Sequence, residues 1–462
     1  MEYSLSKKNI FFRISSFQML AMFRRGLFYS FMSIYLRYFL GLSVTETTYF
    51  ATFPMILNTF FQTYIWGIVS DKTQKRKSLI IWGELLAGVG TFLVWYFHHL
   101  VGDKRASGYI VIIGMTLVEI FWSMSNVGWS AMISDFFSER ERTGIQGKLS
   151  SLGGLGRIVG VLIGGLAYDG FSRQFEGWGF SNGFLFFVAS AVMILSTIPL
   201  FKLPEGGVNT PELIDDLNIS RDRNIEGKSM ENNQNTDNRL KTRKTKTDLI
   251  ENKGFQVKLF TFFLIALIFI NFGRNSVSSI SSQYLKLGEG FNLSNQMLSY
   301  IVNMNSLGLM LFGFIIGRIN RKISDEMLLI IGSVLSLLYL IGFAFARSIP
   351  ILFISSFLLG ISEVVITSSS YTIVSKIIPP EKRGKFFGFY NATFFLSWGI
   401  GGTLLAGPIA DILIKKGQSY NIAYKASFLS GSLLIIIGLI LFIIFSAVEY
   451  RKKKQNSPIN IG

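Results

Sequence analysis

Two stretches of this 462-residue chain repeat one pattern 249 positions apart. Residues 25–43 read RGLFYSFMSIYLRYFLGLS and residues 274–294 read RNSVSSISSQYLKLGEGFNLS, so that Arg25 aligns with Arg274 and a Tyr-Leu pair follows in both. Each arginine lies within an apolar run that is long enough to cross a bilayer. The repeat therefore predicts a duplicated fold in which the two halves have equivalent first helices.

Two further pairs of segments follow in the same order, at offsets of 246 and 241 residues. Residues 66–77 (WGIVSDKTQKRK) align with residues 312–322 (FGFIIGRINRK), and residues 138–149 (SERERTGIQGKL) align with residues 379–390 (PPEKRGKFFGFY). Three correspondences in one register indicate two six-helix halves.

The composition is that of a polytopic membrane protein. Half of the residues are hydrophobic and only 16% are charged, whereas soluble domains carry about 25% charged residues. Backbone groups in lipid must pair within their own segment, so the spans should be helices in an all-α fold. Twelve spans are expected, at about residues 15–40, 46–69, 78–98, 109–134, 149–169, 182–201, 259–285, 296–317, 327–346, 350–377, 386–413 and 423–447.

Four regions follow from this pattern. Residues 1–202 should form the first six-helix bundle and residues 255–450 the second. Residues 203–254 are polar, rich in Asn, Thr and Lys, and should form a linker. Residues 451–462 form a basic tail.

Lysine and arginine mark the sides of the membrane. If the N-terminus is inside, the short inside segments carry 21 Lys and Arg residues and the outside segments carry 9, without the linker. The positive-inside rule then predicts a multi-pass cell-membrane protein with both termini and the linker in the cytoplasm. The net charge of +17 is explained by this topology, so nucleic acid is not expected as a partner.

Metal and cofactor sites are not expected. The chain has no cysteine, and its two histidines, His98 and His99, are adjacent at a predicted helix end. No catalytic constellation and no phosphate-binding GxxxxGK[ST] loop occurs, which argues against an enzyme and against ATP as an energy source.

The segment between the second and third spans carries a known signature. GIVSDKTQKRK fits G-x-x-x-D-x-x-x-x-R-[KR] with Gly67, Asp71, Arg76 and Lys77. With twelve spans, a polar linker and two similar halves, the chain resembles the major facilitator superfamily. The resemblance implies two pseudo-symmetric six-helix bundles and solute transport by alternating access, here by a monomer within the lipid bilayer.

The same resemblance implies a gate at the inner end. Asp71 would accept hydrogen bonds from a helix N-terminus near residues 384–387 and close that end in the outward-facing state. Arg76, Arg142 and Arg383 would add to the latch. The alternative is that Asp71 only caps its helix and Arg76 only anchors at the headgroups.

A glycine series lies on the fifth span. It fits an exporter pattern except that Val161 replaces a proline, and residues 123–135 lack the arginine of proton-coupled exporters. Such spacing also lets helices pack closely, so the direction of transport stays open. The series consists of Gly147, Gly156, Gly160, Gly164 and Gly165.

Arg25 and Arg274 are the leading candidates for substrate contact. A charge in the middle of a span costs about 2.5–3.5 kcal/mol on insertion scales. In the resembling fold the first helix of each half lines the central cavity, where two guanidiniums would suit an organic or phosphate-containing anion. Arg24 points about 100° away from Arg25, and Arg25 is preferred because it has a counterpart. Ion pairing with an acidic residue or simple packing remains an alternative.

Several other polar residues lie deep in the spans. Glu119, Glu363 and Glu84 are candidates for proton coupling or for ion pairs with the arginines, and Glu119 and Glu363 are also candidates for substrate contact. Asn126 and Asn391 are further candidates for solute contact, and Arg157 ranks below the symmetric pair.

The sequence thus predicts a secondary transporter for a small solute, driven by an ion gradient, with protons expected, or by a counter-substrate. The preferred substrate is an anion. A proton-coupled multidrug or metabolite exporter and a non-transporting membrane sensor are the alternatives.

Overall fold

The computed structural model describes most of the chain. The described residues are 6–137, 139–207, 246–320, 322–377 and 383–456. Within these ranges almost every residue is helical and none is in a strand.

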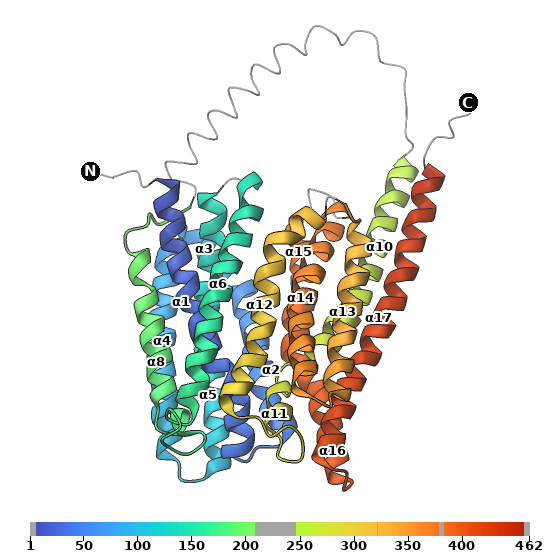
Figure 1. Cartoon of the computed structure of the whole chain (residues 1–462). Helices are drawn as coiled ribbons and strands as arrows, with labels where there is room; N and C mark the ends of the chain where they lie inside the picture. The colour runs from blue at the N-terminus through green and yellow to red at the C-terminus, as the bar shows by residue number, and fades with distance from the viewer. Residues whose placement is uncertain (1–5, 138, 208–245, 321, 378–382, 457–462) are drawn as a thin grey trace, which may run out of the picture.

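The first half of the chain forms a bundle on the left of Figure 1. Its elements are α1 (Lys7–Ile34), η1 (Tyr35–Phe39), α2 (Val44–Phe61), η2 (Gln62–Trp66), α3 (Gly67–Thr73), α4 (Arg76–Leu100), α5 (Lys104–Phe136), α6 (Glu139–Tyr168), α7 (Trp178–Ser181), α8 (Phe184–Ser196) and η3 (Ile198–Leu200).

The second half forms a similar bundle on the right. Its elements are α10 (Lys246–Asn275), α11 (Ser281–Lys286), α12 (Asn295–Ile319), α13 (Asp325–Phe345), α14 (Ile349–Ile377), α15 (Arg383–Gly401), η5 (Gly402–Ala406), α16 (Gly407–Lys415) and α17 (Tyr420–Asn456).

The all-helical membrane fold is confirmed. In the described part of the chain nine helices are long and apolar enough to cross a membrane, and each overlaps an expected span. The expected spans 15–40, 46–69 and 182–201 are also helical. The first two continue through the π-turns η1 and η2, and the third is the shorter apolar helix of residues 184–200.

One span differs from the expectation. Residues 259–285 do not form a single helix, because α10 ends at Asn275 and turns over residues 276–280 lead into α11. This stretch is rich in serine. The backbone N–H of Ser276 still donates to the carbonyl of Phe272 at 2.9 Å, and its hydroxyl donates to the carbonyl of Gly273 at 3.0 Å. The break follows directly after Arg274.

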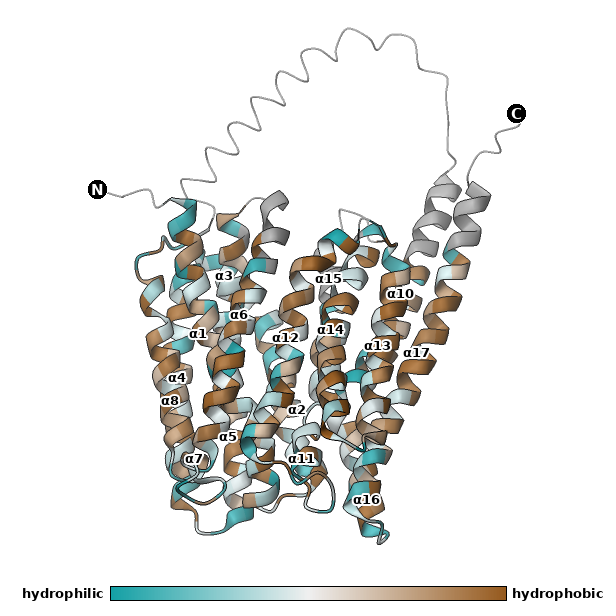
Figure 2. Ribbon diagram, in the orientation of Figure 1, coloured by the Kyte–Doolittle hydropathy of each residue, from teal (hydrophilic) through white to brown (hydrophobic). Residues whose placement is uncertain are grey.

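Both described ends of the chain lie at the top of Figure 1. We call this the inner end, because the charge distribution predicts that it faces the cytoplasm, and the opposite end the outer end. Figure 2 shows hydrophobic residues over the middle of both bundles and hydrophilic residues near the two ends, as expected for a bilayer-embedded molecule. The ribbons of the two bundles come together at the outer end and diverge toward the inner end (Figure 1).

The start of the expected linker packs on the first bundle. Glu205 accepts hydrogen bonds from the backbone N–H of Ser78 (3.1 Å) and from its hydroxyl (2.7 Å) at the first turn of α4. Leu203 is buried against the same bundle. A carboxylate at a helix N-terminus satisfies free N–H groups and the helix dipole together. Residues 208–245 lie outside the described part.

Glycines hold α6 against α1. A methyl group added at Gly156 or Gly160 would collide with the backbone carbonyl oxygen of Met19 or Phe23, and one at Gly164 would lie 2.6 Å from that of Leu27. Gly165 faces Ser299 on α12 instead. Close backbone approach is how helices gain packing contacts in lipid, where the hydrophobic effect between them is lost. Gly147 lies on α6, but its surroundings are outside the described part.

We expect Gly160→Ala to destabilise the protein by about 1–3 kcal/mol, because the added methyl group must push two backbones apart. Gly313→Ala is the matched control, since nothing lies within 4 Å of a methyl group added to this helical glycine. Thermal unfolding of both variants in detergent measures the difference. Equal melting temperatures for the two variants would contradict the close-packing role of Gly160.

Candidate functional site

A buried ion pair lies inside the first bundle. Arg24 on α1 donates Nη1 to the carboxylate of Glu84 on α4 at 3.2 Å, and both side chains are only 1% exposed. Ser125 on α5 donates its hydroxyl to the other oxygen of Glu84 at 2.8 Å. Pairing offsets the cost of taking both charges out of water. The internal pairing that the sequence left open is therefore found at Arg24, the neighbour of the preferred arginine.

Arg25 has a different environment. Its side chain is exposed, and its guanidinium carbon lies 4.6 Å from the centre of the Trp122 ring. The guanidinium of Arg24 lies 3.9 Å from the same ring centre. A tryptophan face attracts cations, so Trp122 on α5 holds both arginines. Trp122 is itself buried, which makes it a support for Arg25 rather than an open contact surface.

Glu119 is hydrogen-bonded to the first of two linked side-chain amides. It is buried on α5 and accepts a short hydrogen bond from the Asn58 side chain, whose oxygen accepts one from Gln62 at 2.6 Å. Gln62 is the first residue of the π-turn η2. The carboxylate is thus connected to an irregular turn in a helix at the boundary between the two bundles, and π-turns often occur at functional sites.

Arg274 lies in the last turn of α10, just before the helix break. It is 5% exposed and donates Nε to the side-chain oxygen of Asn275 at 3.2 Å. Its Nη1 is buried and has no hydrogen-bond partner among the described residues. A cation is favoured at a helix C-terminus, but a buried guanidinium nitrogen without an acceptor is costly. This donor is therefore unsatisfied in the described structure, as are Nε and Nη2 of Arg24.

Glu363 lies near arginines of both bundles. It lies half-buried on α14, and its charge is within interaction range of both Arg157 on α6 and Arg274 on α10. Next to Arg157, the Asn303 side chain of α12 donates to the carbonyl of Ile158 at 3.1 Å, which brings the two bundles together at this level. The sequence ranked Arg157 below the symmetric pair, because nothing in the linear pattern shows that α6 meets α12 and α14 here.

The two candidate asparagines lie apart from these contacts. Asn126 is half-buried on α5, and Asn391 is exposed on α15. His98 has a structural contact: its Nε2 lies 3.0 Å from the hydroxyl oxygen of Tyr35.

The signature between α3 and α4 braces the first bundle. Arg76 is buried and donates to the hydroxyl and carbonyl of Ser70, and its Nε lies 3.4 Å from Asp135 on α5. Lys77 lies 3.6 Å from Glu205. Gly67 begins α3.

Asp71 itself is free of the second bundle in this conformation. Its side chain is 83% exposed and lies 3.6 Å from Arg76. Among the described residues it has no hydrogen bond or ion pair to the second bundle. Arg142 and Arg383 lie on α6 and α15, but their side chains are outside the described part, as are the side chains of residues 384–387.

Among the residues whose side chains are described, the hydrogen bonds between the bundles lie in the outer half of the molecule. In the described residues they join α2 to α15, η5 and α16, η1 and α2 to α11, and α6 to α12. Together with the exposure of Asp71, this describes a state that is closed at the outer end.

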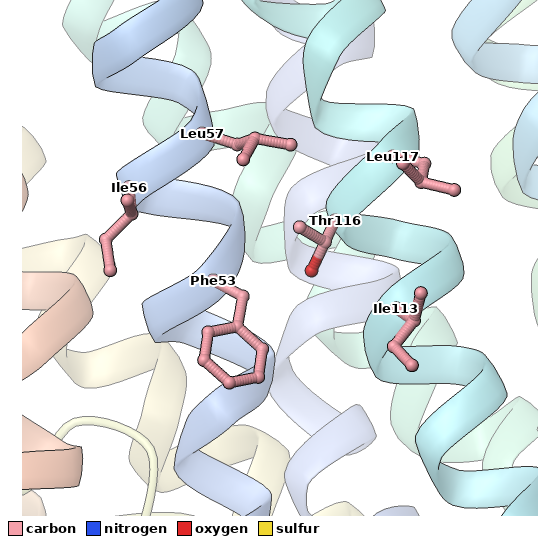
Figure 3. A pocket seen from close by; sticks show the side chains of 6 residues that line it. All are labelled: Phe53, Ile56, Leu57, Ile113, Thr116 and Leu117. Carbon is pink, nitrogen blue, oxygen red and sulfur yellow. The ribbon is translucent and has the colours of Figure 1, made fainter.

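An apolar groove of about 320 Å³ lies between α2 and α5 (Figure 3). Thr116 is its only polar lining residue, and most of the others are exposed. It contains none of the charged candidates and therefore does not form part of their site. The groove is lined by Phe53, Ile56, Leu57, Ile113, Thr116 and Leu117.

Comparisons with known proteins identify the family and the fold. The family model of the Major Facilitator Superfamily matches residues 14–285 and 262–460. A multi-drug resistance efflux pump PmrA homologue from Lactococcus lactis subsp. lactis (strain IL1403) is 26% identical over 211 residues, which are 46% of this chain and 49% of that protein. The chain thus matches about half the length of this relative.

Solved structures of transporters share the fold. The nucleoside transporter NupG has a TM-score of 0.65 at 13% identity, covering 95% of this chain and 99% of that one. A bacterial homologue of the human lysosomal transporter Spinster has a TM-score of 0.63 at 14% identity, covering 96% and 98%. A peptide transporter, POT, in complex with sulfate has a TM-score of 0.64 at 14% identity, covering 96% and 94%.

The duplicated bundles, the signature at Gly67 to Lys77 and a family model that matches nearly the whole chain lead to one conclusion. The chain belongs to the major facilitator superfamily.

Proposed function

We propose that this transporter moves a small organic or phosphate-containing anion by alternating access, driven by a proton gradient or by a counter-substrate. The observation that carries the proposal is the environment of Arg274. Its guanidinium is buried at a helix break, with one nitrogen that lacks an acceptor among the described residues. A carboxylate or phosphate oxygen is the acceptor that best completes a guanidinium.

The charges of the candidate residues, taken together, favour an anion. Glu84 neutralises Arg24, which leaves the guanidiniums of Arg25, Arg157 and Arg274 with the carboxyl groups of Glu119 and Glu363. Protonation of either carboxyl group increases the positive excess.

Glu363 is the proposed coupling group. As a carboxylate it competes with an anionic substrate for Arg157 and Arg274, which belong to different bundles. Once it is protonated, both arginines become available, so proton and substrate would bind together. Glu119 is a second candidate, because its contact with Asn58 leads to the π-turn of a helix at the boundary between the bundles.

We expect Arg274→Gln to weaken anion binding by roughly tenfold or more, because a charge-assisted hydrogen bond contributes about 1.5–3 kcal/mol. The measurement is a thermal-shift titration with inorganic phosphate, small mono- and dicarboxylates and sugar phosphates, followed by uptake of any stabilising anion into proteoliposomes. Arg173→Gln is the matched control, since Arg173 is exposed on an outer loop. An unchanged dissociation constant in Arg274→Gln would contradict a substrate role for Arg274.

We expect Glu363→Gln to retain exchange of substrate across the membrane but to lose accumulation driven by a proton gradient. The neutral amide mimics the protonated carboxyl group and cannot release a proton. Counterflow and gradient-driven uptake in the same proteoliposomes separate the two properties. Gradient-driven uptake at the wild-type level would rule out Glu363 as the coupling group, and Glu119→Gln would then be the variant to compare.

A proton-coupled multidrug or metabolite exporter is the second candidate. The similarity to the efflux pump homologue favours it, and the apolar groove between α2 and α5 offers a surface for lipophilic compounds. Lipophilic cations and neutral sugars in the same thermal-shift screen distinguish the candidates. Stabilisation by lipophilic cations alone would contradict the anion proposal, and a protein that moves no solute would instead fit a sensor.

A further inference from the structure

Asp411 joins the two bundles at their outer end. It lies on α16 and accepts two hydrogen bonds from backbone N–H groups at the start of α2, from Val44 to Oδ1 at 3.0 Å and from Thr45 to Oδ2 at 2.8 Å. Both carboxylate oxygens of a residue in the second bundle therefore contact the first bundle.

These N–H groups have no partner within their own helix. The first four N–H groups of an α-helix lack acceptors, and in α2 the capping box of Ser43 and Glu46 satisfies only the N–H of Glu46 and of Ser43. Asp411 supplies acceptors for the two N–H groups between them. A carboxylate at this position also interacts favourably with the positive end of the helix dipole. The cap of α2 is thus completed by the other bundle.

Other hydrogen bonds between α2 and the second bundle also require that the outer end be closed. The hydroxyl of Thr403 on η5 lies 2.7 Å from that of Thr48 and 2.6 Å from that of Thr52, and Thr52 donates to the carbonyl of Gly399 at 2.5 Å.

A second set of contacts surrounds Gln283 on α11. This buried amide donates to Thr47 of α2 at 2.8 Å and accepts from Tyr424 of α17 at 2.8 Å. Its backbone carbonyl accepts from Tyr38 of η1 at 2.7 Å. If the bundles separated at the outer end, the contacts of Gln283 with Thr47 and Tyr38 would be lost together, whereas its hydrogen bond with Tyr424 lies within the second bundle.

Asp411 and Asp71 lie at opposite ends of one helix pair. The consecutive helical segments α2, η2 and α3 run from the outer end to Asp71 near the inner end. The segments α15, η5 and α16 run from the inner end to Asp411 near the outer end. Each set of segments contains a π-turn, where a helix can change its path. In this conformation both oxygens of Asp411 are bonded across the boundary, whereas Asp71 is 83% exposed.

We infer that Asp411 is the outer latch of the transporter, and that it holds the outer end closed by capping α2 while Asp71 is released at the inner end. The inference rests on the alternating access proposed above. Opening the outer end uncaps α2 and exposes a carboxylate and two N–H groups to water. Hydrogen bonds from the N-terminus of α15 to Asp71 must offset that loss. Asp411 therefore sets the balance between the two end states without contacting the substrate.

The test measures conformation directly and without substrate. The chain has no cysteine, so spin labels can be attached to introduced pairs, Gly102→Cys with Gln418→Cys at the outer end and Thr73→Cys with Lys322→Cys at the inner end. All four positions are exposed. Pulsed electron–electron double resonance in nanodiscs then gives the distribution of distances between the two spin labels at each end.

We expect Asp411→Asn to raise the ratio of outer-open to inner-open molecules by roughly tenfold, since a charge-assisted pair of hydrogen bonds is replaced by a neutral contact. The outer distance should lengthen and the inner distance should shorten. Adding Asp71→Asn should return the distributions toward those of the wild type, because both latches are then weakened.

Glu176→Gln is the matched control. Its partner Lys286 also forms an ion pair across the outer boundary, but the Glu176 side chain is 60% exposed, and such pairs contribute little. If Asp411→Asn leaves the outer distance unchanged, or shifts it no more than Glu176→Gln, the latch is refuted.

Val44→Pro gives an independent test should Asp411→Asn fold poorly. Proline is tolerated at the first helical position, and Ser43 before it is extended. The substitution removes one of the two N–H groups that donate to Asp411 and replaces the buried Val44 side chain by the smaller proline ring. It should shift the distances in the same direction, and an unchanged distribution would contradict the inference. Because no substrate is present, failure to find a transported anion would leave this result unaffected.

Discussion

A guanidinium inside a lipid-embedded bundle must be paired with a carboxylate, another acceptor or water. The four candidate arginines within the spans of this chain have different partners. Arg24 is paired with Glu84. Arg25 is exposed and supported by Trp122. Arg157 and Arg274 share Glu363 at a distance. Arg24 forms an ion pair within one bundle, although its Nε and Nη2 lack hydrogen-bond partners among the described residues. Arg25, Arg157 and Arg274 form no ion pair among the described residues, so these three are the arginines whose charge a ligand or a nearby proton can balance.

The same reasoning applies to the backbone at the boundary between the bundles. Helix α2 begins at this boundary with N–H groups that need acceptors, and Asp411 of the other bundle supplies them. Within a bundle, by contrast, α1 and α6 meet through glycines so closely that a methyl group would not fit. Close packing at glycines also occurs across the boundary, where a methyl group added at Gly407 would lie 2.9 Å from the Cα of Thr45. The boundary adds hydrogen bonds, and water or another helix end can replace these when a transport cycle separates the bundles.

The sequence predicted much of the fold because each main feature leaves a local trace. Apolar runs predict spans, the order of three repeats predicts two bundles, and the signature from Gly67 to Lys77 predicts the family. The helix break after Asn275 was not predicted, since its serine-rich stretch can also continue a membrane helix. At the break the backbone of Gly401 on α15 approaches Ser276, a contact that the linear pattern does not show.

The site was less accessible to sequence reasoning. Alignment of the repeats selected Arg25 and Arg274. The adjacent Arg24 differs from Arg25 only in the direction in which its side chain leaves the helix. That direction decides which of the two arginines pairs with Glu84. Asp411 left no signal at all, because its partners are backbone N–H groups that any sequence would supply. A duplicated fold therefore shows its halves in the sequence, whereas the contacts that let those halves move against each other arise only where two helix ends meet in space.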